Sequence, residues 1–269
     1  MGVSGGTPMG RGFGVGALLA SLLAPATVAE AQWNDPKLIA GQVAFHTAVS
    51  FVAKLIHHEP PGRAIREALE SGTLAGGLSH AGYCIAGRNP EWALVGKALA
   101  QKGALTTRRS VDGLPVFDRS LATHWEITHS FVHFEWNGKP KIEVDAINAA
   151  FSAYYLAAGE PYELDAKRTL LSGSLVFRNH APPPRLLGYY VPGVVWIDSE
   201  RLDDRHVWGH ELVHSLQAER GSAIRDWHYG PLRFNWLVLT SGVPALFAGW
   251  PDHDRRLHEL EAEGYSIPR

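Results

Sequence analysis

Five consecutive residues, His210-Glu211-Leu212-Val213-His214, place two imidazoles and a carboxylate at a spacing that could bind a metal ion and activate water. Side chains four residues apart lie on one face of a helix, so both imidazoles can bind a single ion. Neutral imidazole nitrogens suit Zn²⁺, and Glu211 lies beside them, where it can take a proton from water. The motif therefore predicts metal-assisted hydrolysis, with His210 and His214 as ligands and Glu211 as general base.

The sequence around the motif has the pattern that this chemistry requires. Chance alone would place HExxH about 0.04 times in a chain of this composition. Val195 to Asp198 is typical of a strand, Ser199 or Asp203 can cap the helix that follows, and Gly221 can end it. We therefore expect a strand followed by a helix of about four turns. The alternative is a surface helix with two incidental histidines.

A third ligand must come from elsewhere, because the metzincin continuation His-x-x-Gly-x-x-His is absent after His214. The late cluster from Glu259 to Glu263 reads Glu-x-x-Ala-Glu and, together with HExxH, resembles the gluzincin arrangement. That resemblance implies Glu259 as the zinc ligand and Glu263 as a carboxylate that orients a ligand. The alternative for this cluster is a solvated acidic helix end.

A second acidic candidate is Asp226. The stretch Asp226-x-x-Tyr229-Gly230 is similar to the aspzincin element. However, Asp226 follows His214 by only twelve residues, which is a short distance for the chain to turn back. Glu259 is therefore the favoured third ligand, and Asp226 is the alternative. For the donor that stabilises a developing oxyanion, the candidates are His228, Tyr229 and Tyr265.

A looser resemblance covers most of the chain after its first 31 residues. Ala75-Gly76-Gly77-Leu78, Leu94-Val95-Gly96-Lys97, the HExxH helix and the late glutamates resemble an uncharacterised group of bacterial exported proteins. The resemblance implies a fold with a metal site and no particular substrate. The segment from Thr106 to Arg109 departs from the pattern of that group.

The chain begins with a pattern that predicts export. Residues 1–31 combine a short basic start, an apolar stretch and the sequence Ala29-Glu30-Ala31, as in a cleaved signal peptide. An uncleaved N-terminal anchor is the alternative. We expect residues 32–113 to form a helical region and residues 114–269 a zincin-like metal-binding region in the periplasm or cell envelope.

The composition limits the possible partners and the role of the single cysteine. The net charge is −2, and no basic stripe with interleaved aromatic residues appears, so nucleic acid is not expected. The single Cys84 cannot form an internal disulfide and should be a small buried residue. Small residues in the helical region allow tight helix packing or peripheral membrane contact. Nothing in the sequence indicates the oligomeric state.

These patterns predict an α+β fold with a small, mostly antiparallel sheet. Helices should fill residues 38–103 with a break at Pro60-Pro61-Gly62, and Asn137-Gly138 should turn a hairpin. His46, His57 and His58 should be surface or capped residues and not ligands, because they have no metal-ligand spacing, and together with Lys54 they argue against an ordinary membrane span. His129 and His133, four apart on one strand, would be about 13 Å apart, too far to share an ion. The remaining elements are expected as strands 124–136, 141–144, 170–178 and 188–198, and as helices 64–71, 92–102, 147–158 and 234–250.

The combined expectation is a zinc-dependent peptidase acting on a peptide or protein substrate. In zincin-like folds, the strand bordering the cleft pairs with the extended substrate, and Tyr189, Tyr190 and the stretch from Val194 to Ile197 are the candidates for that strand. Two alternatives remain open. One is a non-catalytic envelope scaffold that keeps a structural metal, and the other is an interaction protein without a metal.

Overall fold

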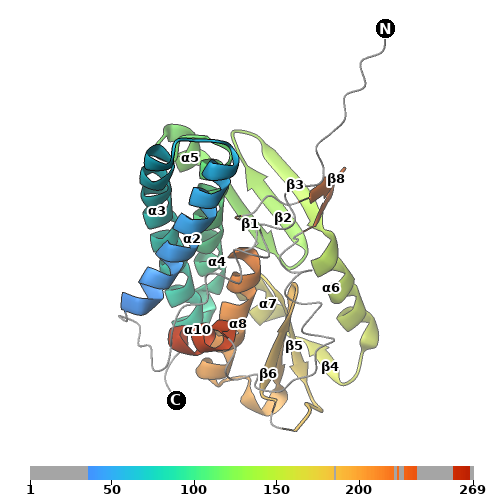
Figure 1. The fold of residues 1–269 in the computed structure, drawn as a ribbon. Helices are drawn as coiled ribbons and strands as arrows, with labels where there is room; N and C mark the ends of the chain where they lie inside the picture. Colours follow the sequence, from blue (N-terminus) through green and yellow to red (C-terminus); the bar gives the residue numbers. More distant parts are fainter. Residues whose placement is uncertain (1–35, 185, 221–222, 224–226, 235–256, 267–269) are drawn as a thin grey trace.

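The computed structural model describes residues 36–184, 186–220, 223, 227–234 and 257–266, and Figure 1 shows their arrangement. The predicted signal peptide, Asp226 and nearly all of the predicted helix 234–250 lie outside these residues. Within them, the fold is α+β, as predicted: a helical N-terminal half, two small sheets, the HExxH helix and a C-terminal helix that carries Glu259.

The helical half consists of three long helices that pack side by side (Figure 1). Pro60 and Pro61 separate the first two, and the segment predicted as a helix 64–71 plus a small-residue stretch is one continuous helix. The bounds are α2 Pro36–Ile56, α3 Pro61–Arg88 and α4 Ala93–Val111, with the short η1 Pro90–Trp92 between the last two and α5 Arg119–Thr123 after them. By its length and composition, α2 could cross a membrane. Core helices of soluble proteins can meet the same two criteria.

Small residues set the close approach of these helices. A methyl group on Gly82 of α3 would lie 2.4 Å from the carbonyl oxygen of Gly96 in α4, and one on Gly96 would lie 2.5 Å from that of Gly82. Backbone-to-backbone packing of this kind explains why the region is rich in glycine and alanine. Cys84 is buried there, as predicted.

His57 and His58 are exposed, as predicted, but the prediction that His46 is a surface or capped residue is wrong. His46 is completely buried, and its two ring nitrogens bond Thr107 at 2.7 Å and Ser79 at 2.9 Å. Burial lowers the pKa of His46 to about 3, so this imidazole is neutral. Lys54 is also buried and forms an ion pair with Glu67 at 2.7 Å. Both side chains satisfy their polar groups inside the helical layer.

The first sheet has five strands in the order β1-β2-β3-β9-β8. The predicted strand 124–136 is in fact a hairpin, because Ser130 adopts a positive φ of 57° and reverses the chain. The turn at Asn137-Gly138 is confirmed. The strands are β1 Trp125–His129, β2 Val132–Trp136, β3 Pro140–Asp145, β8 Trp227–Tyr229 and β9 Leu232–Phe234.

His129 and His133 therefore lie on neighbouring strands and not on one strand as predicted. In the register, His129 pairs with Val132 and His133 pairs with Thr128. His133 is buried and accepts a hydrogen bond from Arg233 at 2.6 Å. The two rings thus have different neighbours.

The second sheet has four strands in the order β4-β5-β7-β6, and both sheets are mixed, with one parallel pair each. The predicted strand 170–178 begins as a helix, and the predicted strand 188–198 is a hairpin that turns at Gly193, whose φ is 77°. The strands are β4 Tyr162–Leu164, β5 Leu175–Asn179, β6 Gly188–Val191 and β7 Val194–Asp198. Two helices accompany them, α6 Ala146–Ala158 and α7 Ala166–Ser172.

Strand β7 leads through the short η2 Ser199–Arg201 into α8 Arg205–Arg220, as the predicted strand-then-helix order requires. The cap is Asp204 and not Ser199 or Asp203, because its carboxylate accepts hydrogen bonds from the amides of His206 and Val207. Helix α8 packs against α3, α4, β6 and α10 Leu257–Tyr265, and one apolar core joins these elements.

Gly209 fixes the position of the HExxH helix. A methyl group there would lie 2.0 Å from the carbonyl oxygen of Gly87 in α3. We expect Gly209→Ala to lower the free energy of unfolding by about 1–3 kcal/mol, as overpacking does. Urea denaturation of the variant measures this. Gly41→Ala is the control: it lies in α2 with open space around it, so it should stabilise the protein by about 0.5–1 kcal/mol. Equal effects of the two substitutions would contradict this account of the packing.

Candidate metal centre

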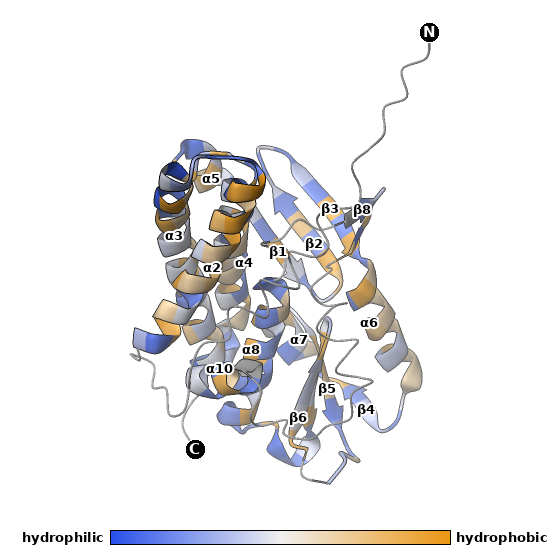
Figure 2. Ribbon diagram, viewed as in Figure 1, coloured by the Kyte–Doolittle hydropathy of each residue, from blue (hydrophilic) through white to orange (hydrophobic). Residues whose placement is uncertain are grey.

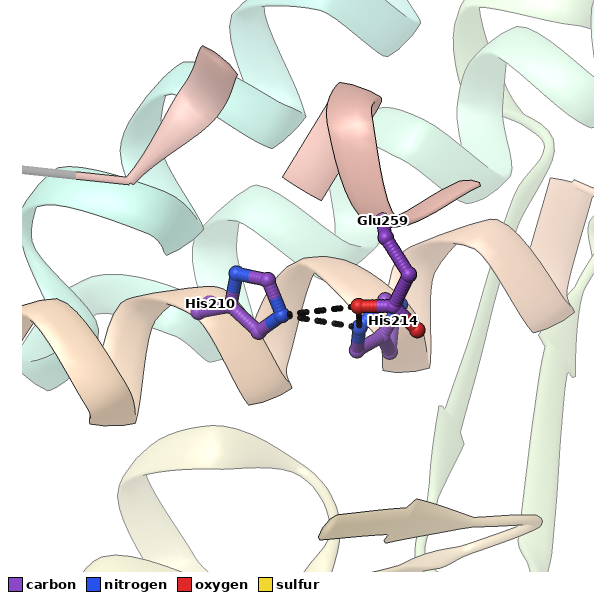
Figure 3. A group of neighbouring side chains, drawn as sticks. All are labelled: His210, His214 and Glu259. Carbon is purple, nitrogen blue, oxygen red and sulfur yellow. Dashed lines mark hydrogen bonds and ion pairs between the residues drawn. The ribbon is translucent and has the colours of Figure 1, made fainter. Parts of the chain in front are cut away.

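The structure brings His210 and His214 of α8 together with Glu259 of α10 (Figure 3). The Nε2 atoms of the two histidines are 3.1 Å apart, and each is 3.1 Å from Oε2 of Glu259. Two histidines four residues apart and a glutamate 45 or more residues further on thus place three donor atoms at the corners of a nearly equilateral triangle. This is the arrangement that the HExxH motif and the late glutamate predicted.

The triangle has the size and chemistry of a zinc site. With bonds of about 2.0–2.1 Å, two ligands of a tetrahedral zinc ion lie about 3.3 Å apart, close to the 3.1 Å seen here. A neutral imidazole has one N–H, so at most one of the two facing Nε2 atoms can donate to the other. The donor set of two nitrogens and one carboxylate oxygen is that of a catalytic zinc site. These residues therefore fit a zinc ion, although the identity of the ion is a proposal.

Electrostatics at the triangle favour positive charge. Burial disfavours the protonated form of His210, but hydrogen bonds to Glu259 and Glu263 and the charge of Glu211 outweigh it and raise its pKa to about 10. The pKa of His214 is also raised, because Glu259 and Glu211 outweigh burial. Carboxylates thus stabilise a cation here, and a divalent ion would replace the protons.

A second hydrogen-bonded layer fixes the ring of His214. Its Nδ1 lies 2.7 Å from Oε1 of Gln217, one turn further along α8. The Nε2 of Gln217 donates to Glu261 at 3.0 Å, which turns the amide oxygen toward the imidazole. When His214 is neutral, its one proton therefore lies on Nδ1, and the lone pair of Nε2 points into the triangle. Glu261 in turn accepts hydrogen bonds from Arg220 at 2.9 Å and from Gln42 at 2.8 Å.

We expect Gln217→Leu to weaken zinc binding by about 10–100-fold, the usual effect of losing a group that orients a ligand. The reason is that His214 loses the acceptor that fixes its tautomer. Competition with a chromophoric chelator measures the affinity. Gln42→Leu is the matched control: it removes a different hydrogen bond to Glu261 and should have a smaller effect. Equal affinity of wild type and Gln217→Leu would contradict the orienting role.

Glu263 lies on the other side of His210. One of its carboxylate oxygens is 3.5 Å from Nδ1 of His210 and 3.4 Å from Nε2 of His206. This position, between two imidazoles on successive turns of α8, is compatible with the orienting role that the gluzincin resemblance implies. That role stays a prediction.

Glu211 is buried between α8 and the edge of the second sheet. A methyl group on Gly188 of β6 would lie 2.9 Å from Oε1 of Glu211, so the carboxylate lies against the backbone of that strand. Burial raises the pKa of Glu211, and the charges of His214 and His210 oppose this shift. A carboxylate with a raised pKa is a better proton acceptor near neutral pH than an ordinary one.

The other predicted site residues lie elsewhere or are engaged. Nδ1 of His228 is 2.9 Å from the carboxylate of Glu143 in the first sheet, and the ring of Tyr229 on the same strand is largely exposed. The hydroxyl of Tyr265 is buried against Nδ1 of His80 at 2.9 Å. Oxyanion stabilisation by any of these residues stays a prediction. Asp226 lies outside the described residues.

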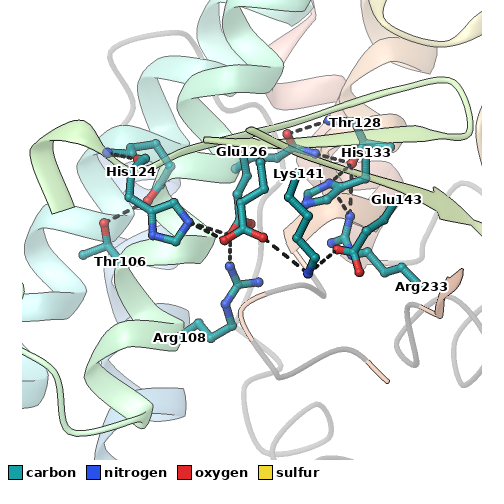
Figure 4. A network of polar contacts seen from close by, with 12 residues as sticks. Thr106, Arg108, His124, Glu126, Thr128, His133, Lys141, Glu143 and Arg233 are labelled. Atoms are coloured by element: carbon teal, nitrogen blue, oxygen red, sulfur yellow. Dashed lines mark hydrogen bonds and ion pairs between the residues drawn. The ribbon is translucent and has the colours of Figure 1, made fainter. Parts of the chain in front are cut away.

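A second group of potential ligands, His124, Glu126 and Glu135, lies between α4 and the first sheet (Figure 4). Here the carboxylates already have cationic partners, since Arg108 contacts Glu126 and Lys141 lies 3.6 Å from Glu135. His124 Nε2 is 3.0 Å from Glu135 and 3.3 Å from Glu126. This group is therefore an ion-pair network, and we do not propose a metal site there.

Gln217, Glu261 and Gly188 were not predicted as site residues from the sequence. Gln217 could have been found, because it follows His214 by three residues and thus lies on the same helix face. Glu261 was noticed only as part of an acidic cluster, and Gly188 had no local signal. Their roles depend on how α10 and β6 pack against α8.

Comparisons of this chain with protein-family models, with curated proteins and with solved structures found no match. The candidate metal centre is therefore supported by its motif and its geometry: a His-x-x-x-His pair and a distant glutamate that converge on one point.

Proposed function

We propose that this protein is a zinc-dependent peptidase of the gluzincin type, with His210, His214 and Glu259 as ligands. The observation that carries the proposal is the triangle of donor atoms, each 3.1 Å from the other two. A buried carboxylate, Glu211, adjoins the same helix turn and has a raised pKa. A purely structural zinc site has no need of such a base, whereas hydrolysis requires one.

The residues of the chain divide the chemistry between them. A bound zinc ion would supply Lewis acidity for a substrate carbonyl and lower the pKa of a water molecule. Glu211 accepts the proton of the attacking water and then delivers it to the leaving amine, which keeps the proton balance over one turnover. Gln217 and Glu263 hold the two imidazoles in place from the outside.

The position of β6 supports a peptide as the substrate. This strand is at the edge of the second sheet and runs antiparallel to β7, so one of its backbone edges is not used within the sheet. It packs against α8, with Gly188 touching Glu211. An extended peptide that adds to this edge by β-augmentation would pass the general base. Of the predicted border residues, Tyr189 and Tyr190 are on β6, whereas Val194 to Ile197 form the interior strand β7.

The cell envelope is the proposed location, and its support is the export signal predicted in residues 1–31 of the sequence. Fractionation of cells that express the full chain tests this location. A processed protein in the periplasm or envelope supports it, and an unprocessed cytosolic protein contradicts it.

Metal analysis combined with a peptidase assay tests the proposed function. The purified chain should contain about one zinc per molecule and should hydrolyse members of a quenched-fluorescence peptide library. A zinc chelator should remove both the metal and the activity, and added zinc should restore them. Stoichiometric zinc without hydrolysis would favour a scaffold with a structural metal, and the absence of zinc would favour an interaction protein.

A further inference from the structure

The five-stranded sheet has polar side chains on its inner face and apolar side chains on its outer face. This is the reverse of an ordinary sheet that covers a protein core. Its inner face lies against α4 and is polar: Gln101 of α4 bonds Thr128 at 2.9 Å, and Arg108 contacts Glu126 (Figure 4). The inner residues are buried or paired with one another. They are Glu126, Thr128, His133, Glu135, Lys141, Glu143, Asp145, His228 and Arg233.

The outer face of the same strands is apolar. Side chains alternate between the two faces of a sheet, and Figure 2 shows both hydrophobic and hydrophilic residues along these strands. Phe134, Trp136 and Ile142 are 42%, 52% and 62% exposed. The register places Ile127, Phe134 and Ile142 in one row and Trp125, Trp136 and Pro140 in the next. None of these outward strand positions in the described sheet is acidic, lysine or arginine.

Further exposed apolar side chains lie at one end of the molecule. The row with Trp136 lies at the tip of the β2–β3 hairpin, and α5 ends two residues before Trp125, so α5 lies at the same end (Figure 1). Just before α5, Leu114 is 47% and Phe117 is 70% exposed, and Phe117 lines an open pocket together with residues of α3, among them Leu69 and the exposed Glu70. We call Trp125, Phe134, Trp136, Ile142, Leu114 and Phe117 the apolar tip.

Exposed cations flank this surface. Lys139 occupies the hairpin turn between Trp136 and Ile142, and Arg119 begins α5. The nearby Asp118 is already paired with Arg109 at 3.2 Å. Deeper in the sheet Val132 and Val144 are half-buried, whereas Tyr229 on the edge strand β8 is 71% exposed. Aromatic rings bordered by lysine and arginine are typical of the boundary between lipid chains and headgroups.

We propose that the apolar tip binds the surface of an anionic lipid membrane. Exposed apolar patches mark binding surfaces, and outward apolar with inward polar side chains is the pattern of lipid-facing sheets. A second copy of the chain would bring the same cations to this face and no acidic strand residue to pair with them. Anionic headgroups complement Lys139 and Arg119, and the lipid chains accommodate the tryptophans. The inference does not depend on the metal centre.

Vesicle co-sedimentation of the full mature chain tests the proposal. Wild type should bind vesicles of phosphatidylcholine with phosphatidylglycerol more strongly than vesicles of phosphatidylcholine alone, and salt should reduce the difference. The double variant Trp136→Ser/Ile142→Ser should bind at least tenfold more weakly. The matched control is Trp92→Ser/Leu170→Ser, because these side chains are 65% and 68% exposed but belong to η1 and α7. It should bind like wild type.

A third variant keeps the test valid if the double variant does not fold, as judged by circular dichroism. Lys139→Glu changes one exposed turn residue and should reduce only the part of binding that depends on phosphatidylglycerol, since Arg119 remains. Three results would overturn the proposal: no binding of wild type to either vesicle, equal loss in the tip and control variants, or Lys139→Glu binding like wild type. A stable dimer in light scattering that the tip variant dissociates, without vesicle binding, would identify a second copy as the occupant instead.

Discussion

Glu211→Gln should reduce peptidase turnover by about 10²–10⁴-fold, the usual contribution of a general acid–base group. Glutamine has nearly the same shape, so it should fit between α8 and Gly188, but it cannot accept and return a proton. Zinc content should stay at the wild-type level, because Glu211 is not a corner of the donor triangle. Steady-state kinetics on a cleaved library peptide and metal analysis of the same preparations measure the two quantities.

Glu219→Gln is the control for this variant. Glu219 is a buried carboxylate on the same helix, two turns further on, and it accepts a hydrogen bond from Gln101 at 2.7 Å. Its loss should lower stability and leave turnover within a few-fold of wild type. If Glu211→Gln retains both zinc and turnover, the chain does not use this residue as its base. A zinc scaffold would show no hydrolysis in either protein.

His214→Ala should lower zinc affinity by more than the 10–100-fold expected of a supporting residue, because it removes one of three ligands. Zinc at a hundred times its dissociation constant should stabilise wild type by about 2.7 kcal/mol, since it binds the folded state alone. The variant should gain no such stabilisation at the same concentration. Calorimetric melting with and without zinc, together with metal analysis, checks both statements.

His206→Ala tests whether zinc loss requires removal of a ligand or follows from removal of any histidine on this part of α8. His206 lies one turn before His210 on α8, is buried, and approaches Glu263 at 3.4 Å, but it is outside the donor triangle. Its loss should leave stoichiometric zinc in the purified protein. Equal zinc loss in His206→Ala and His214→Ala would mean that general damage to the helix, and not loss of a ligand, explains the result.

Local patterns in the sequence predicted the elements near the site well. The strand–helix order of β7 and α8, the helix α6 and the Asn137-Gly138 turn depend on residues that are close in the chain. The predicted strands were wrong where a short local turn or helix signal lay within a longer pattern that is typical of a strand. The alternation through 124–136 concealed the reversal at Ser130, and α7 was missed because apolar residues within 170–178 also match a strand.

The outward face of the first sheet shows why alternation alone is insufficient. Alternation along a strand places Trp125 and Ile127 on the same face, but it does not say which face of a sheet is buried. In the structure the polar residues point inward, because α4 supplies Gln101 and Arg108 as partners for Thr128 and Glu126. That choice depends on a helix whose residues are 18 and 27 positions away in these two contacts.

By itself, the sequence determined the helix that carries His210, Glu211 and His214, because helical periodicity fixes where residues four apart must point. It also limited the candidates for the third ligand to two acidic residues, Glu259 and Asp226. Only the tertiary structure decided that Glu259 meets the two imidazoles, that Glu261 orients His214 through Gln217, and that Glu211 lies against β6. Those contacts join elements far apart in the chain, and their distances follow from how α10 and the second sheet pack against α8.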